Sequence, residues 1–226
     1  MVQREIGGLF AFIGYWLLGI GYWVLAIGYR LLGIGYWVLD IGKEVKMTLK
    51  TFYFNPYREC TYVLSNEAGQ AVIIDAGMYE EREQQRFAEY INQQKLQPIA
   101  LLITHAHPDH VCGIDYLQQT YQLTAIIQPQ EGKLALPQAD WHIEVIATPG
   151  HKEDCVCYHL PDEKMLFTGD TLFQESIGRT DLPGGDMATL IQSLKKLVLL
   201  PEDTQVYPGH GYPTTIAHEK LYNPYL

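Results

Sequence analysis

The sequence predicts an α+β fold in which stacked β-sheets are covered by helices, and three observations lead to this class. From residue 47 onward, short apolar runs bounded by turn residues come in groups, as strands do. Segments with helical spacing stand between some of these groups without strict alternation. The length of 226 residues allows one sizeable core. Stacked sheets therefore fit better than a simple doubly wound sheet.

The expected elements follow the chain in order. Apolar and β-branched runs predict strands at Thr61–Ser65, Ala71–Asp75, Ile99–Thr104, Leu123–Gln128, Ile143–Thr148, Cys155–Leu160 and Lys164–Thr168. Helical spacing predicts helices at Glu80–Gln94, Ile114–Tyr121 and Met187–Leu199. Phe87 and Ile91 would form one apolar face of the first helix, and Asp186 is a start signal for the last.

Residues 1–46 differ from the rest of the chain. They contain near-copies of one seven-residue unit: YWLLGIG, YWVLAIG, YRLLGIG and YWVLDIG. The DNA repeat TATTGGG encodes Tyr-Trp-Val-Leu-Gly-Ile-Gly in every reading frame, so we interpret this segment as translated repeat DNA preceding a functional chain that begins at Met47. The alternative is a membrane anchor within residues 6–41, which the apolar length allows. Arg30, Asp40 and the many glycines weaken that alternative.

Charge and cysteine content exclude some classes of function. The net charge is −10, and no basic stripe suited to nucleic acid is evident. The four cysteines do not form the framework of a small disulfide-rich secreted protein. Cys155 and Cys157 would point to one face of a strand, where they are poorly placed to bridge each other. We therefore expect reduced cysteines and a cytoplasmic location.

Histidine and aspartate residues follow several of the apolar strands. The string THAHPDH follows Ile99–Ile103, and three other apolar runs lead into TPGH, TGD and PGH. His105 and His107 stand two apart, so both imidazoles face the same way in an extended segment. Pro108 turns the chain, and Asp109 and His110 then project at a different angle. One loop can thus serve two metal ions, with zinc, iron and manganese all compatible with these ligands.

These motifs resemble the metallo-β-lactamase fold, whose His-x-His-x-Asp-His signature THAHPDH matches and whose later motifs occur here in the same order. The resemblance covers residues 47–226 and implies an αββα sandwich with a binuclear centre. The implied ligands of the first ion are His105, His107 and His151. The implied ligands of the second ion are Asp109, His110 and His210, with Asp170 bridging the two ions. Asp75 resembles the family's aspartate that supports the metal loop from behind.

The stretch FQESIGRTDLPGGD narrows the choice within the family. Gly178-Arg179 resembles the glyoxalase II branch, in which a basic residue at this place helps to hold the substrate, so Arg179 would hold an anionic part of it. Asp181 stands where hydroxyacylglutathione hydrolases usually have an aromatic residue, and their C-terminal glutathione-binding helices are expected to be missing. Both departures make tight recognition of glutathione thioesters doubtful. The string GRTD also resembles persulfide dioxygenases, which use a single iron.

The favoured function is hydrolysis of a thioester or related ester, glyoxalase II-like, by metal-activated hydroxide. Asp109 and Asp170 would also orient the nucleophile or carry its proton. The expected cofactors are two divalent ions, zinc before iron or manganese, and the expected partner is a small-molecule thioester. A non-catalytic zinc-stabilised domain is the alternative of another class, disfavoured because none of the candidate ligands is cysteine. Ribonuclease and exported β-lactamase members fit less well, and the oligomeric state stays open.

Overall fold

The computed structural model describes residues 22–31, 34–43, 47–136, 138–139 and 141–226. Contacts divide the chain into two compact units, Met1–Lys46 and Met47–Leu226. In the first unit, β1 (Tyr22–Leu31) pairs antiparallel with β2 (Ile34–Lys43). The part of the repeat before residue 22 lies outside the described residues, and its origin as translated repeat DNA stays a prediction. No helix among the described residues has the length and hydrophobicity needed to cross a membrane.

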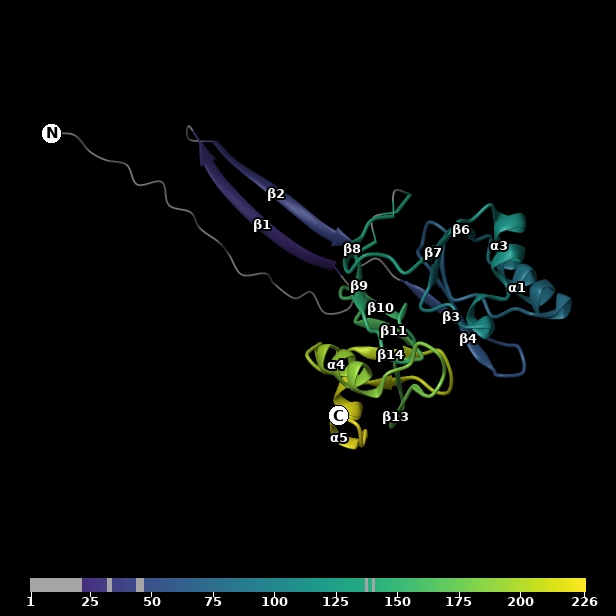
Figure 1. Ribbon diagram of the computed structural model, residues 1–226. Helices are drawn as coiled ribbons and strands as arrows, with labels where there is room; N and C mark the ends of the chain where they lie inside the picture. Colours follow the sequence, from purple (N-terminus) through teal and green to yellow (C-terminus); the bar gives the residue numbers. More distant parts are fainter. Residues whose placement is uncertain (1–21, 32–33, 44–46, 137, 140) are drawn as a thin grey trace. The chain divides into compact units, whose positions relative to one another are not determined.

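The second unit contains a five-stranded sheet in the order β3-β4-β5-β6-β7 (Figure 1). Its strands are β3 (Thr48–Phe54), β4 (Glu59–Ser65), β5 (Gln70–Ile74), β6 (Gln97–Ile103) and β7 (Ala125–Ile127). The first three strands are antiparallel neighbours, whereas β6 runs parallel to both β5 and β7. The carboxyl end of β6 therefore opens into its loop at the same edge as that of β5.

A six-stranded sheet in the order β15-β14-β11-β10-β9-β8 faces the first. Its strands are β8 (Gly132–Leu134), β9 (Ile143–Ala147), β10 (Val156–Leu160), β11 (Met165–Gly169), β14 (Gln205–Pro208) and β15 (Thr214–Thr215). A small hairpin of β12 (Leu172–Phe173) and β13 (Ser176–Ile177) follows β11. Strands β9, β11 and β14 point the same way, because β10 is antiparallel to β9 and β11 while β14 is parallel to β11. Their carboxyl ends therefore lie at one edge.

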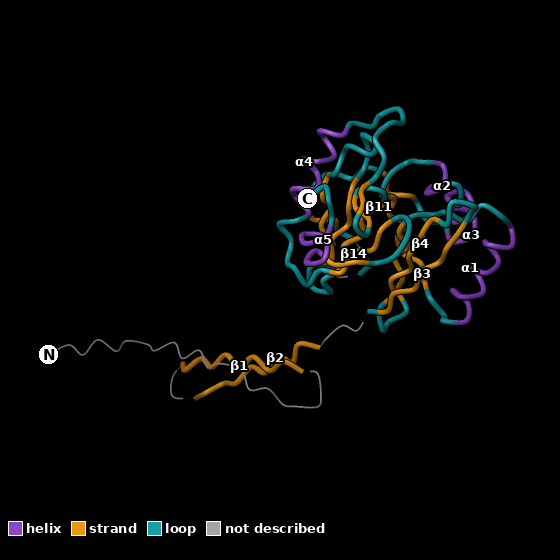
Figure 2. Tube along the Cα trace, turned by 90° about the horizontal axis from the view of Figure 1, so that it is seen from below, coloured by secondary structure: helices purple, strands orange, loops and turns teal. Residues whose placement is uncertain are grey.

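Helices cover the outer faces of both sheets (Figure 2). They are α1 (Glu81–Gln93), α2 (Pro108–Val111), α3 (Ile114–Tyr121), α4 (Met187–Leu197) and α5 (Ile216–Tyr222). Helices α1 to α3 lie on the side of the five-stranded sheet, and α4 and α5 lie on the other side. The Asp186 carboxylate accepts a hydrogen bond from the Thr189 backbone at 2.7 Å, which confirms the expected start of α4. The αββα prediction is confirmed.

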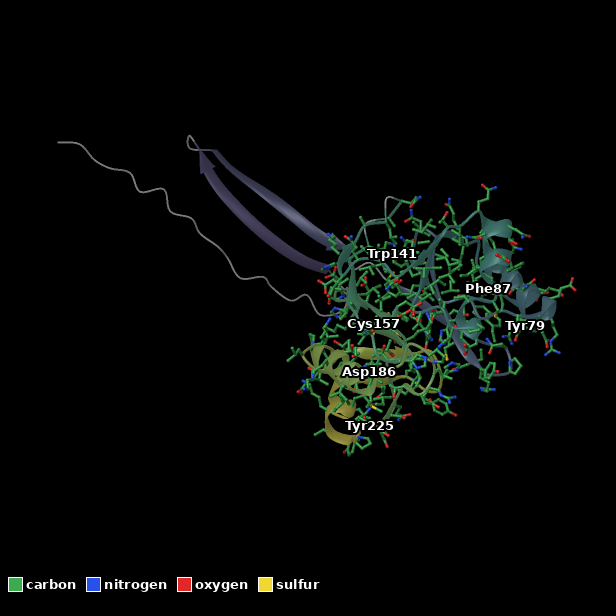
Figure 3. The ribbon with its side chains drawn as sticks, in the orientation of Figure 1. Tyr79, Phe87, Trp141, Cys157, Asp186 and Tyr225 are labelled. Atoms are coloured by element: carbon green, nitrogen blue, oxygen red, sulfur yellow. The ribbon has the colours of Figure 1, made fainter. Side chains whose placement is uncertain are left out.

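Three apolar clusters fill the spaces between these layers. On β6, side chains alternate: Ala100 and Leu102 belong to the cluster between the sheets, whereas Leu101 and Ile103 belong to the cluster beneath α1 and α3. This division follows from the two-residue period of a strand. The third cluster joins the six-stranded sheet to α4 and α5. Figure 3 labels one member of each cluster: Trp141 between the sheets, Phe87 beneath α1 and Cys157 beneath α4.

Most of the predicted elements are present, with ends displaced by a few residues. All four cysteines are free, as expected. Several short elements were not predicted as such, including β3, β8, β12, β13, β15 and α5. Strand β3 was not predicted because Lys50 and two threonines interrupt its apolar pattern. It pairs with β4 along its whole length, and its buried residues Phe52 and Phe54 belong to the cluster beneath α1. The other missed elements are too short for a sequence period to be visible.

Candidate metal centre

Loops at the carboxyl ends of the strands bring the predicted ligands together. His105 and His107 follow β6, and the latter is the N-cap of α2, which carries Asp109 and His110. Pro108 at the first position of α2 keeps His107 extended and starts the helix at once. His151, Asp170 and His210 follow β9, β11 and β14 in the same way. Segments far apart in the sequence thus contribute to one site.

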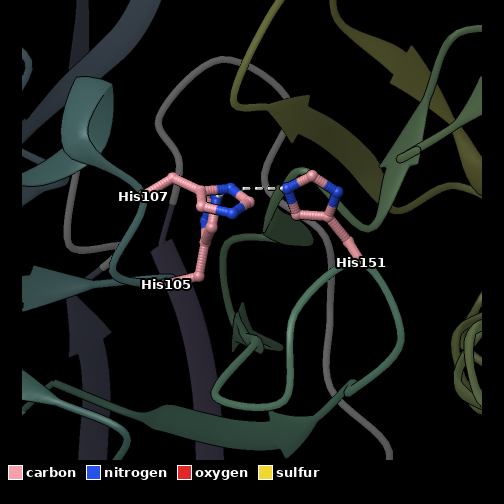
Figure 4. A group of neighbouring side chains, drawn as sticks. All are labelled: His105, His107 and His151. Atoms are coloured by element: carbon pink, nitrogen blue, oxygen red, sulfur yellow. Dashed lines mark hydrogen bonds between the residues drawn. The ribbon is translucent and has the colours of Figure 1, made fainter. Parts of the chain in front are cut away.

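His105, His107 and His151 form the first half of the site (Figure 4). The Nδ1 atom of His107 lies 3.1 Å from Nε2 of His105 and 2.8 Å from Nε2 of His151. The three ligand atoms lie within 4.8 Å of one another. A ring nitrogen has either one hydrogen or one lone pair, so His107 Nδ1 cannot make two good hydrogen bonds here. This convergence fits an arrangement of ligands around one cation.

The outer ring nitrogens of the histidines fix which nitrogen faces the centre. The Thr104 hydroxyl donates to Asp75, so it accepts from Nδ1 of His105, 3.1 Å away. Nδ1 of His151 donates to the Arg179 carbonyl oxygen at 2.7 Å. Because Nδ1 of each ring makes the outer hydrogen bond, Nε2 is the nitrogen that faces the site.

Asp109, His110 and His210 form the second half of the site, again with ligand atoms within 4.8 Å of one another. His210 Nε2 lies 3.1 Å from Oδ2 of Asp109, and its Nδ1 donates to the Tyr57 carbonyl oxygen at 3.0 Å. His110 is fully buried, with Nδ1 2.9 Å from Oδ2 of Asp75. The Nε2 atoms of both rings therefore face the centre, as those of His105 and His151 do in the first half.

Asp170 lies between the two halves. Its Oδ2 atom is 3.6 Å from Nε2 of His151 and 3.7 Å from Nε2 of His210, so one oxygen faces a ligand of each half. Its Oδ1 atom lies 3.4 Å from Nε2 of His110. Oδ1 of Asp170 and Nε2 of His110 are both buried without a hydrogen-bond partner. Unpaired buried groups are costly, and a divalent cation bound by both would satisfy them. The donor set and these two atoms fit a binuclear metal site.

Asp75 supports the site from behind, where the sequence placed it. Its backbone is in the left-handed region, with φ of 60°. Its carboxylate accepts from the Thr104 amide and hydroxyl, both at 2.8 Å, and from His110. One carboxylate therefore fixes both the start of the THAHPDH loop and the ring of His110.

Close packing at glycines was not predicted. A Cβ atom at Gly209 would lie 2.4 Å from Oδ1 of Asp170 and 2.6 Å from Cε1 of His110. A Cβ atom at Gly178 would lie 1.9 Å from the Asp170 carbonyl oxygen. Glycine is needed at both positions because the backbone approaches the ligands too closely for a side chain.

Asp154 is a second feature that the sequence analysis missed. Its Oδ2 atom accepts from the Ala106 amide at 3.0 Å and lies 2.7 Å from the Lys152 ammonium. Ala106 stands between two ligands of the first half, so Asp154 ties the loop of His151 to the loop after β6. The signal in the sequence was an aspartate three residues after a candidate ligand, which gives no hint of its distant partner.

The two halves differ in how readily their histidines hold a proton. Burial lowers the pKa of His105 well below its ordinary value, and burial also lowers the pKa of His107. Burial would likewise lower the pKa of His110, but Asp170 and Asp75 raise it well above its ordinary value. The pKa of His210 is raised against its burial by Asp109 and Asp170. Burial opposes ionisation of Asp170, yet His110 holds its pKa far below the usual range.

Arg179 lies beside the site through its backbone, while its side chain is occupied elsewhere. The guanidinium makes two hydrogen bonds of 2.6 Å to the carboxylate of Asp181. Both side chains are exposed, by 61% and 67%. The Arg179 hydrogen bonds hold the pKa of Asp181 at about 2. The role of Arg179 in binding an anionic part of the substrate stays a prediction, and Asp181 competes for the same charge.

Comparison with known families and proteins agrees with this geometry. The model of the metallo-beta-lactamase superfamily matches residues 58–144 and 128–210. The probable metallo-hydrolase YqgX of Bacillus subtilis is 32% identical over 202 residues, covering 76% of this chain and 93% of the relative. Hydroxyacylglutathione hydrolase GloC of Haemophilus influenzae is 31% identical over 201 residues, covering 75% and 92%. The mitochondrial persulfide dioxygenase ETHE1 of Bos taurus is 34% identical over 194 residues, covering 76% and 74%.

Solved structures show the same relationship. The B3 metallo-β-lactamase BLEG-1 superposes with a TM-score of 0.74 at 32% identity, covering 79% of this chain and 99% of the other. TTHA1623, solved in a di-iron-bound form, superposes with a TM-score of 0.70 at 31% identity, covering 78% and 100%. Relatives at similar identity thus carry several different names, and the choice among their activities depends on the site.

Proposed function

The chain belongs to the metallo-β-lactamase superfamily, and from this premise we propose that it is a metal-dependent hydrolase that cleaves a thioester or related ester. The observation that carries the proposal is the second half of the site. Asp109, His110 and His210 converge, and the buried Nε2 atom of His110 has no hydrogen-bond partner. Two-ion hydrolysis would use this half for its second ion.

The residues that would hold two divalent ions divide as the geometry does. His105, His107 and His151 would hold one ion, Asp109, His110 and His210 the other, and Asp170 would lie between the two. When bound, the ions supply a hydroxide nucleophile at neutral pH and polarise the carbonyl group of the substrate. Zinc suits imidazole and carboxylate donors, and so does iron, which the relative TTHA1623 contains.

The two aspartates have further roles in this proposal. Burial alone would raise the pKa of Asp109, but hydrogen bonding from His210 and the charge of His110 lower it, so its carboxylate is ionised at neutral pH. Asp170 is ionised for the same kind of reason. Both can therefore accept a hydrogen bond from the attacking water and fix its orientation. The thiolate released from a thioester is a good leaving group, so no strong general acid is required.

A persulfide dioxygenase is the second candidate, because the ETHE1 relative is 34% identical and the chain also carries the string GRTD. The two candidates differ in their co-reactant. A hydrolase consumes water and releases a thiol, whereas a dioxygenase consumes oxygen and oxidises sulfur.

The discriminating experiment supplies both substrates to one preparation. Protein loaded separately with zinc and with iron is given S-lactoylglutathione, with thiol release followed by a thiol reagent, and glutathione persulfide, with oxygen uptake followed by an electrode. We expect thiol release with both metals and no oxygen uptake. Oxygen uptake without thioester cleavage would reverse the assignment. A chromogenic β-lactam is tested in parallel, because the β-lactamase BLEG-1 is as similar to this chain in sequence as the hydroxyacylglutathione hydrolase is. Faster hydrolysis of the β-lactam than of the thioester would also overturn the thioester proposal.

A further inference from the structure

Two loops surround His151, and hydrogen bonds hold them together. Residues 148–154 carry His151 itself, and residues 178–186 lie against them. The Arg179 carbonyl oxygen accepts from His151, and the Asp186 amide donates to the Gly150 carbonyl oxygen at 2.8 Å. Any substrate that reaches the first half of the metal centre from this side meets the charges of these two loops.

Every basic side chain of the two loops is paired with a carboxylate two residues later. Lys152 pairs with Asp154 at 2.7 Å, and Arg179 pairs with Asp181 through two bonds. Glu153 and Asp186 add further negative charge, so residues 148–154 and 178–186 carry two basic and four acidic residues. The loops beside His151 therefore have a negative net charge and offer no uncompensated cation.

The Arg179–Asp181 pair decides what an anionic substrate meets here. The Asp181 carboxylate accepts from Nε and Nη2 of the guanidinium, so it compensates the positive charge of Arg179 while the Nη1 side of the guanidinium stays open. An anionic substrate group that binds the open side of the guanidinium lies beside the negative charge of Asp181. A neutral or cationic group does not have this cost.

We propose that Asp181 is a specificity-determining residue that selects thioesters whose group at this loop is neutral or cationic rather than anionic. This inference rests on the proposed thioester hydrolysis. Replacing Asp181 by asparagine keeps the size of the side chain, removes its charge and frees the Arg179 guanidinium. The enzyme would then gain affinity for a carboxylate at this place.

The test compares two probes that differ by one charge. They are S-acetyl-N-acetylcysteine, which has one carboxylate, and its neutral carboxamide, and the quantity measured is the ratio of kcat/KM for the acid to kcat/KM for the amide. For Asp181→Asn, we expect this ratio to rise about fivefold at low ionic strength, the factor for one unit charge at about 4 Å in water. The rise should come from a lower KM for the acid, and it should shrink with added salt.

Two further variants make the result specific. The matched control is Asp203→Asn, because Asp203 forms a similarly exposed ion pair with Lys164. Lys164 lies on the turn before β11, and Asp203 lies in the segment before β14. This control changes net charge equally and should leave the ratio as in the wild type. Arg179→Met added to Asp181→Asn should abolish the gain, since the freed guanidinium is then absent.

The outcomes separate the two proposals. A fivefold rise in the Asp181→Asn ratio that Arg179→Met removes supports the inference. Hydrolysis of both probes with an unchanged ratio overturns the inference and leaves the hydrolase intact. An equal rise in Asp203→Asn also overturns it, because the effect is then one of net charge alone. Failure of the metal-loaded wild type to hydrolyse either probe overturns the proposed function and the inference with it.

Discussion

The two halves of the metal centre have the same number of protein ligands but opposite electrostatic characters. His105, His107 and His151 are all imidazoles, and burial lowers the pKa of the first two. In the other half, His110 and His210 lie among carboxylates that raise their pKa values. Without a metal ion, His110 and His210 therefore keep their protons to a higher pH than His105 and His107 do.

This difference shows how such a site can exist before it binds a metal. In the second half, protonated His110 lies between Asp75 and Asp170, and protonated His210 lies beside Asp109, so each positive charge has a negative partner. In the first half, His151 Nε2 lies 3.6 Å from Oδ2 of Asp170, and burial lowers the pKa values of His105 and His107. In the proposed binuclear site, protons would compete with a divalent ion to a higher pH at His110 and His210 than at His105 and His107, and this difference yields separate predictions for the two halves.

The largest effect is expected from Asp170→Asn, because Asp170 faces ligands of both halves. Removing its negative charge should weaken the binding of both ions. We expect kcat/KM for a thioester to fall by about a thousandfold, the size typical for loss of a principal electrostatic group. Metal content and kcat/KM are measured on the same preparation, with Asp203→Asn as the control. A loss of less than about tenfold would mean that Asp170 does not join the two halves.

The next prediction concerns pH and compares the halves directly. Protons compete with metal ions for Nε2, and a histidine with a raised pKa keeps its proton to a higher pH. His110 and His210 have raised pKa values, whereas those of His105 and His107 are lowered. As pH falls from about 8 to about 5, across the ordinary histidine pKa of about 6.5, the second half should release its ion first.

Cobalt-substituted protein makes this order visible, because the absorption of cobalt reports the ligands of each ion. We expect two separate transitions, and His210→Ala should remove the one at higher pH. A single transition in the wild type, or release from the first half at the higher pH, would contradict the prediction. Either result would show that the histidines of the second half do not have the higher proton affinity.

A smaller effect is expected at Asp154, which supports only the first half. Asp154→Ala removes the acceptor for the Ala106 amide between His105 and His107. We expect the affinity of the first half to fall by about tenfold to a hundredfold, as for other residues that position ligands. Asp154→Asn keeps an oxygen acceptor and should recover most of the loss. Metal affinity is measured by competition with a chelator. Equal affinity in the alanine variant and the wild type would show that Asp154 does not position the ligands of the first half.

The sequence predicts the layers and the ligands because both depend on local patterns. The two-residue period of β6 decides which of its apolar side chains face each layer, and the HxHxDH string fixes which candidate ligands follow its end. The resemblance to a family then orders the remaining motifs. The structure places these side chains close to one another, and their role as metal ligands stays a prediction.

The features that the sequence does not predict depend on contacts with residues distant in the sequence, or on which of two possible partners a side chain binds. Asp154 acts through the amide of Ala106, a contact that requires the two loops to be placed first. Gly209 is needed only because Asp170 and His110 approach it from other strands. Arg179 stands where the family's basic residue is expected, yet its side chain selects Asp181, and a sequence motif cannot show that competition.

The measurement that tests the central claim most directly is the metal content of three proteins: the wild type, His107→Ala and His210→Ala, each dialysed with zinc and assayed for thioester hydrolysis. If each half binds one ion and both ions serve the reaction, the wild type should contain about two zinc ions per chain and each variant about one. Activity should be reduced in both variants. A wild type that binds one ion, with hydrolysis unchanged in His210→Ala, would contradict the binuclear account.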